Sequence, residues 1–374
     1  MKSICPKTTI SLILLSGWAS PLPGHPDPLE NIKIYTHILA ASPDNAYALL
    51  NRGICYRMVF DFDRSIADFD RAEELGITGE ALWMNRAMSF LPRKDYDSAL
   101  DDLDRVVEAR PDDATNLFYR GEVYYRQGRY SEAIEDYTAS LATRETAHVY
   151  YVRGDALAML ERYDEALEDL TRAAKMRPYT VGYRIARARL LGRMGRFEEA
   201  FEDLENAREK QPERYEVYVQ RAVLSASRGL DASAEADLRT ALKFVQDELF
   251  FRPESAAVYA DRAKIQDLLG NSEEALDDLG KSIGYAPPNE PKFHRLRAEL
   301  LRRLGRMKEA EEDLSAAELA KDRPYPTATP LPGPTLSLEE LQVAPTPNLL
   351  PGLVEITPTP PSAATPAVPP ASSD

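Results

Sequence analysis

Apolar and polar residues alternate along most of the chain with the spacing of amphipathic helices. The segment "NLFYRGEVYYRQ" (residues 116–127) places apolar or aromatic side chains three or four positions apart. Gly128 interrupts the pattern, and "YSEAIEDYTASL" (residues 130–141) resumes it. Two such segments separated by a glycine predict a helical hairpin. Each helix would be only about 20 Å long, so one hairpin cannot bury a core alone.

The hairpin pattern recurs along the chain. Each copy contains an arginine followed by glycine or alanine, and an aspartate stands sixteen residues after that arginine. The pairs are Arg52 and Asp68, Arg86 and Asp102, Arg120 and Asp136, Arg153 and Asp169, Arg187 and Asp203, Arg221 and Asp237, Arg262 and Asp278, and Arg297 and Asp313. Successive arginines are 34, 34, 33, 34, 34, 41 and 35 residues apart. A period near 34 residues is typical of helical hairpins stacked into a solenoid.

Residues 46–320 resemble the tetratricopeptide repeat family in the order of small, aromatic and large apolar positions. The third copy carries Gly121, Tyr124, Ala133 and Tyr137, and the fourth carries Gly154, Leu157, Ala166, Leu170, Ala173 and Pro178. Arginine stands where the family usually has a leucine before the small residue, as in a bacterial variant of the repeat. The resemblance implies an all-α, right-handed superhelical solenoid of about eight helix-turn-helix repeats.

The recurring arginine and aspartate are expected to form a structural ion pair in each repeat. The arginine falls on the first helix and the aspartate on the second, one residue before the large apolar position. We expect a bidentate, partly buried contact whose main effect is to fix the register of the two helices. The rival interpretation is a ladder of arginines that binds an acidic ligand. It is weaker because every arginine already has a carboxylate in its own repeat.

Segments outside the eight repeats complete the predicted domain organisation. Residues 29–42 read as a lone capping helix, with Ile32, Tyr35, Ile38 and Leu39 at helical spacing. Seven extra residues near "KFVQDELFFRPES" equal about two helical turns and predict a longer second helix in the sixth repeat. Phe250 and Phe251 would then lie near its end, either packed against the seventh repeat or contacting a partner.

The resemblance also implies a binding groove, because the first helices of this family line the concave face of the solenoid. The candidate peptide-binding residues are Tyr47, Leu50, Ile54, Met84, Met88, Phe118, Tyr125, Tyr151, Arg189 and Arg193. Apolar and aromatic surface of this kind usually marks an interaction site, and methionine suits adaptable recognition. The alternative is that part of the set fills contacts between repeats. A ligand with an apolar end and an acidic end would fit this set best.

Two asparagines, Asn51 and Asn85, resemble those of the carboxylate clamp in chaperone-binding members of the family. The positions of the basic clamp residues are instead occupied by Leu50, Ile54, Thr115 and Tyr119. Recognition of a chaperone C-terminus by that route is therefore not expected.

Composition argues against nucleic-acid binding and gives no sign of catalysis. The net charge is −15, whereas phosphate binding needs clustered lysine and arginine. The sequence contains no phosphate loop, nucleophile elbow or zinc-protease motif, and its histidines have no metal-ligand spacing. These histidines are His25, His37, His148 and His294. We expect neither an enzyme nor a cofactor or metal.

The two ends of the chain differ from the repeats. Residues 1–19 have two lysines before a short apolar run and small residues at Gly17 and Ala19, which predicts a signal peptide followed by a linker over residues 20–28. The run is too short to span a bilayer. The protein is expected to be exported to the cell envelope or medium; the alternative is a cytoplasmic protein with a disordered leader.

Residues 321–374 are rich in proline and threonine and hold half of the 28 prolines. Such a segment predicts disorder, and as a coil it would span about 40 Å, enough to contact its own solenoid. The sequence as a whole predicts a non-catalytic scaffold that binds a protein or peptide of unknown identity in its concave groove. The alternative is a regulatory or assembly subunit of an envelope or secreted complex that uses convex or terminal surfaces.

Overall fold

A computed structural model describes residues 27–288 and 290–321, and within them the chain is helical with no strand. The predicted signal peptide, nearly all of the linker and the tail from residue 322 lie outside the described residues. The helices are α1 (Pro28–Ala41), α2 (Ala46–Met58), α3 (Phe62–Glu74), α4 (Glu80–Phe90), the 3-10 turn η1 (Leu91–Arg93), α5 (Tyr96–Ala109), α6 (Ala114–Arg126), α7 (Tyr130–Thr143), α8 (Ala147–Met159), α9 (Tyr163–Met176), α10 (Val181–Arg193), α11 (Phe197–Lys210), α12 (Tyr215–Ser227), α13 (Asp231–Phe251), α14 (Ala256–Leu268), α15 (Ser272–Tyr285), α16 (Lys292–Arg303) and α17 (Met307–Lys321).

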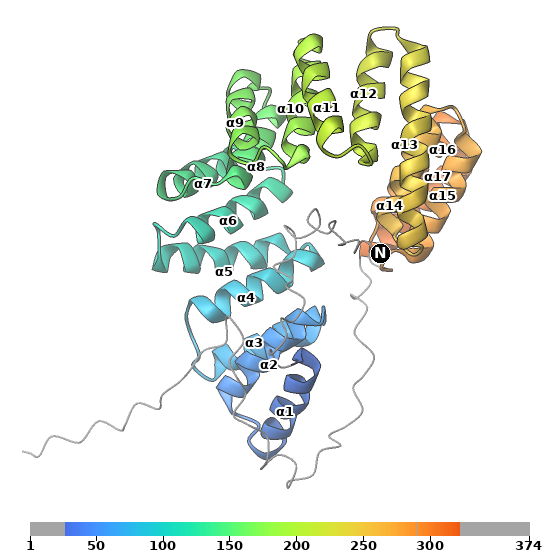
Figure 1. Cartoon of the computed structure of the whole chain (residues 1–374). Helices are drawn as coiled ribbons and strands as arrows, with labels where there is room; N and C mark the ends of the chain where they lie inside the picture. Colours follow the sequence, from blue (N-terminus) through green and yellow to red (C-terminus); the bar gives the residue numbers. More distant parts are fainter. Residues whose placement is uncertain (1–26, 289, 322–374) are drawn as a thin grey trace, which may run out of the picture.

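Helices α2 to α17 form eight consecutive hairpins, and α1 packs against α2 at the start of the stack. The predicted all-α solenoid is confirmed. Figure 1 shows the hairpins following one another around an open arc from α1 to α17. The first helices of consecutive repeats also contact one another, α2 with α4, α8 with α10 and α10 with α12. The first helices therefore lie on the inner side of the arc, where neighbouring repeats approach more closely.

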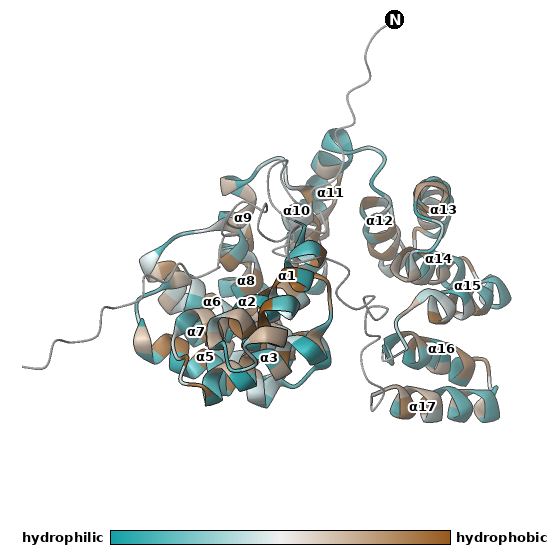
Figure 2. Cartoon of the chain, turned by 90° about the horizontal axis from the view of Figure 1, so that it is seen from below, coloured by the Kyte–Doolittle hydropathy of each residue, from teal (hydrophilic) through white to brown (hydrophobic). Residues whose placement is uncertain are grey.

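Apolar surface is distributed along the arc rather than gathered at one centre. Figure 2 shows brown and teal residues on the same helices, the mixture expected of amphipathic helices. The buried apolar residues form a succession of clusters, each shared by neighbouring repeats. Each repeat is thus stabilised mainly by the repeats beside it.

The turn inside each hairpin places one residue in the left-handed region. In the third repeat this residue is Gly128, with φ of 79°. The fourth repeat has Glu161 there instead, with φ of 60°, a conformation that costs a residue with a Cβ about 1–2 kcal/mol. The glycine that ended the first amphipathic segment in the sequence therefore marks a geometric requirement of the turn.

The small residue after the recurring arginine is needed where the two helices of a hairpin meet. A Cβ atom on Gly121 would lie 2.8 Å from the ring of Tyr137, and one on Gly53 would lie 2.8 Å from the ring of Phe69. Both rings are fully buried. The close approach lets a large aromatic side chain fill the hairpin without forcing the helices apart.

Helix α13 is 21 residues long, as the seven extra residues predict, against 14 for α11 and α15. Phe250 and Phe251 lie at its end with exposed fractions of 81% and 79%, and their ring centroids are 5.3 Å apart. Neither ring is buried against the seventh repeat. Leu249, which is 5% exposed, provides the buried contact there.

One contact crosses the opening of the arc. The Lys94 Nζ, just after η1, lies 3.3 Å from the Glu290 Oε1 between α15 and α16. The two side chains are 47% and 33% exposed, so water weakens this ion pair.

Candidate functional site

The recurring arginine and aspartate meet in every repeat. Each arginine on a first helix donates from Nε and Nη2 to the two carboxylate oxygens of the aspartate sixteen residues later, over distances of 2.5 to 2.8 Å. The carboxylates are buried: the eight aspartates are 2% to 7% exposed. Bidentate pairs of this geometry are among the strongest polar contacts in proteins.

A third donor, Nη1, extends the contact to the preceding repeat. In seven repeats Nη1 donates to a side-chain oxygen on the previous second helix, over 2.6 to 3.3 Å. These acceptors are Thr36, Asp70, Asp104, Thr138, Thr171, Glu205 and Gln246. Arg297 has no such bond among the described residues, and the residue sixteen positions before it is Lys281, which cannot accept. We call this series of contacts the arginine ladder.

The arginine ladder therefore ties each of the first seven repeats to the helix that precedes it. Thr36 lies on α1, so the capping helix supplies the acceptor that a preceding second helix would supply. The sequence analysis did not predict the Nη1 acceptors, although an acceptor stands fifteen or sixteen residues before each of these seven arginines. Because all three donor positions are occupied in most repeats, these arginines are structural.

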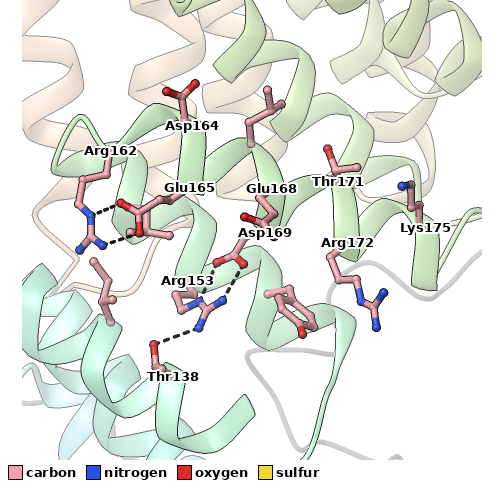
Figure 3. Close-up of a pocket in the computed structure, with 14 residues that line it drawn as sticks. Thr138, Arg153, Arg162, Asp164, Glu165, Glu168, Asp169, Thr171, Arg172 and Lys175 are labelled. Atoms are coloured by element: carbon pink, nitrogen blue, oxygen red, sulfur yellow. Dashed lines mark hydrogen bonds and ion pairs between the residues drawn. The ribbon is translucent and has the colours of Figure 1, made fainter. Parts of the chain in front are cut away.

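A cavity with a volume of about 890 Å³ is built on one step of the arginine ladder. Figure 3 shows Arg153 between Asp169 and Thr138, with the Arg162 and Glu165 pair nearby. Similar clefts surround Arg221 and Arg297 in other repeats. A cleft that recurs with the repeat is a product of stacking second helices, so it does not single out a binding site.

The predicted groove residues divide into three groups. Tyr47, Arg189 and Arg193 are exposed, whereas Met84, Met88, Phe118, Tyr125 and Tyr151 are partly buried. Leu50 and Ile54 are each only 2% exposed, so their placement on an open groove floor was wrong. Both belong to the apolar cluster formed with residues of α1 and α3, because the first repeat also packs against the capping helix.

An aromatic belt crosses the inner side of the arc from α6 to α10. We define it as Phe118, His148, Tyr151 and Tyr183, whose successive ring centroids are 5.4, 6.2 and 5.4 Å apart. Burial lowers the pKa of the His148 imidazole, so this ring is uncharged at neutral pH. The sequence identified Phe118 and Tyr151 but not His148, which was considered only as a possible metal ligand.

Polar groups beside the aromatic belt are already paired. The Tyr125 hydroxyl donates to Asp155 Oδ2, and Arg189 Nη2 donates to Asp155 Oδ1 over 3.2 Å. Burial, and then the bond to Asp155, raise the pKa of Tyr125, so the phenol remains a donor. Arg193 Nη2 donates to the Tyr163 hydroxyl over 3.0 Å. The predicted basic end of the groove is therefore partly neutralised by the protein itself.

The described part of the chain contains no group of three or more histidine, cysteine, aspartate and glutamate side chains placed to hold a metal ion. Among those same residues, no helix is both long and apolar enough to cross a bilayer.

Comparison with known proteins identifies one family. A sequence model of the family described as "Tetratricopeptide repeat" matches residues 84–147, 120–179, 185–248 and 252–328, which together make up more than half of the chain. No curated protein matches the chain.

Several solved structures are similar in fold. The crystal structure of MamA is 21% identical, covers 46% of this chain and 98% of its own, and has a TM-score of 0.41. A tetratricopeptide repeat protein from Parabacteroides merdae is 19% identical over 64% of this chain and 91% of its own, with a TM-score of 0.44. YrrB, described as having an unusual peptide-binding site, is 20% identical over 57% of this chain and 93% of its own, with a TM-score of 0.34.

Proposed function

The chain belongs to the tetratricopeptide repeat family, and from this premise we propose that it is a non-catalytic scaffold that binds an extended segment of a protein partner in its concave groove. Proteins of this family generally act as scaffolds for protein interactions. Fold alone does not fix the ligand, so the proposal depends on the chemistry of the inner face.

The aromatic belt is the observation that carries the proposal. Phe118, His148 and Tyr151 are partly buried side chains on first helices, with rings in contact across two repeats. Aromatic rings present a large apolar area at a small entropic cost and dominate the energy of many protein interfaces. Met84 and Met88 on α4 are likewise partly buried, and they extend the apolar surface toward the N-terminal end.

Replacing Met84, Phe118, Tyr125 and Tyr151 by alanine is expected to lower partner capture by about ten-fold or more, because truncated aromatic anchors usually cost over 1 kcal/mol each. The measurement is quantitative affinity capture from cell-envelope and secreted fractions, with the full chain and the variant as baits. Circular dichroism checks that the variant is folded. The matched control is the F250A/F251A variant, which removes two exposed rings outside the groove.

The control also tests the rival function, an assembly subunit that uses convex or terminal surfaces, because α13 is a second helix and its exposed end lies away from the row of first helices. The exposed Phe250 and Phe251 pair is the specific observation that favours that rival. A partner held by the groove variant but lost by F250A/F251A would refute groove binding and place the interface at the end of α13. A partner lost only by the groove variant supports the scaffold that we propose.

We further propose that the protein is exported, on the basis of the signal-like pattern in residues 1–19. Cell fractionation followed by N-terminal sequencing should find the protein outside the cytoplasm, beginning near residue 20. An intact N-terminus in the cytoplasmic fraction would favour the alternative.

A further inference from the structure

Arg57, on α2, differs from the other arginines of the solenoid. Within residues 27–288 and 290–321, it is the one arginine that is at least partly buried and has no carboxylate within salt-bridge distance. The other arginines of that region that lack a carboxylate are all exposed: Arg144, Arg177, Arg193, Arg295 and Arg302.

A partly buried cation without a counter-ion is unfavourable for folding. Removing part of its hydration costs free energy that a nearby anion or a full set of hydrogen bonds offsets. The burial of Arg57 lowers the pKa of its guanidinium, and the Tyr119 phenol on α6 partly opposes this effect. Arg52, one and a half turns earlier on the same helix, shows how the fold normally supplies a carboxylate.

The hydrogen bonds of Arg57 leave one edge of the guanidinium unused. Its Nε donates to Asn85 Oδ1 over 3.0 Å, and Asn85 Nδ2 donates to the Ala81 carbonyl over 2.7 Å, which fixes the amide orientation. No hydrogen bond from Nη1 or Nη2 occurs within the described residues. These two nitrogens form the end-on edge of the guanidinium, which matches the two oxygens of a carboxylate. In the arginine ladder the Nε and Nη2 edge is used instead.

The surroundings of Arg57 connect it to the groove. Arg57, Asn85 and Tyr119 come from α2, α4 and α6, the first helices of three consecutive repeats. Met84, Met88 and Tyr119 border one apolar cluster, and the Tyr119 ring lies 5.2 Å from Phe118 at the start of the aromatic belt. Arg57 therefore lies at the N-terminal end of the same row of first helices.

We propose that Arg57, oriented by Asn85, binds a carboxylate of the ligand at the N-terminal end of the groove, with the adjoining apolar segment of the ligand on the aromatic belt. This inference rests on the groove-binding function proposed above. It differs from the carboxylate clamp considered from the sequence, because the basic positions of that clamp are not basic here. Either a chain-terminal carboxylate or an aspartate or glutamate side chain has the required chemistry.

The test follows the side-chain Nε–Hε resonance of Arg57 in the full chain by NMR while sodium acetate is added, with the R57M variant to assign the signal. Acetate is expected to shift this resonance saturably, at a concentration about ten-fold lower than it affects Arg193, an exposed arginine on the same face. Sodium chloride at equal ionic strength should not reproduce the shift. Equal responses of Arg57 and Arg193, or an equal effect of chloride, would overturn the proposal.

Two capped dipeptides distinguish the source of the carboxylate. Acetyl-Leu-Phe with a free C-terminus and acetyl-Leu-Glu with an amidated C-terminus are titrated in the same way. Preference for the first assigns the subsite to a chain end, and preference for the second to an acidic side chain. Failure of acetate and of both dipeptides to shift the Arg57 resonance rejects the subsite.

The stability of the R57M variant provides an independent readout. If Arg57 serves to bind a ligand, it does not stabilise the ligand-free protein. The midpoint of urea unfolding of the variant should then be the same as that of the wild type or higher. A lower midpoint would show a structural role and contradict the proposal. If acetate binds at Arg57 while the groove variant retains its partner, the anion subsite stands and the groove-binding function fails. The reverse result removes the subsite alone.

Discussion

Replacing Arg86 by methionine is expected to destabilise the solenoid by about 3–5 kcal/mol, the cost of stranding a buried charge. Arg86 is the most deeply buried arginine of the ladder: its side chain is 9% exposed, and that of its partner Asp102 is 3% exposed. Arg86 also contacts Asp70 and Glu73, so its loss removes the cation shared by three carboxylates. Urea denaturation followed by circular dichroism, with hydrogen exchange of α4 and α5, measures the effect.

The pH dependence and a double variant separate charge from packing. Burial already raises the pKa of Asp102 in the intact pair. Without Arg86 the carboxyl is stabilised in its protonated form, so the deficit should be largest at neutral pH and shrink as the pH falls toward about 4. R86M/D102L, which replaces both partners with apolar groups, should recover most of the loss. A pH-independent deficit, unrelieved in the double variant, would attribute the effect to packing.

An exposed pair supplies the matched control. Arg239 and Glu235 on α13 form an ion pair with side chains that are 73% and 55% exposed. R239M should change the free energy of unfolding by less than about 1 kcal/mol, because water already solvates both charges. Comparable losses in R239M and R86M would mean that burial does not set the energy of the arginine ladder.

The arginine ladder shows what a single sequence can predict. The sixteen-residue spacing identified every Arg and Asp pair, because a repeat presents the same geometry several times and chance agreement becomes improbable. The Nη1 acceptors were not predicted, because the residue type at that position varies among threonine, aspartate, glutamate and glutamine. A repeated chemical property, here the ability to accept a hydrogen bond, is less visible in a sequence than a repeated residue type.

The groove could be predicted only in part, for a physical reason. Repeat phase assigns residues to the inner face, but burial depends on what each repeat contacts, and the first repeat also contacts α1. Leu50 and Ile54 were therefore predicted to line the groove, although they are buried in a cluster that includes residues of the capping helix. Arg57 was missed for the opposite reason. It occurs in one repeat, and its lack of a carboxylate partner is a property of the three-dimensional structure.

Truncation of Phe69 to alanine is the second large effect that we expect, again about 3–5 kcal/mol, because it empties a fully buried aromatic site. Phe69 on α3 packs against Gly53 on α2 and belongs to the cluster that joins the first hairpin to α1. Removing the ring leaves a cavity between α2 and α3. F250A is the matched control: the same substitution at a ring that is 81% exposed should change stability by less than about 0.5 kcal/mol.

The location of the damage in F69A tests how the solenoid is held together. Each repeat contacts mainly its neighbours, so hydrogen exchange should accelerate in α1 to α4 while α14 to α17 keep their protection. The Lys94 and Glu290 contact across the arc is too exposed to couple the two ends. Uniform loss of protection along the whole chain would contradict nearest-neighbour coupling. Loss of protection confined to α1 to α4 would support nearest-neighbour coupling. A ligand that spans α2 to α10 would then stabilise the N-terminal repeats directly, and its binding should restore protection in those repeats first.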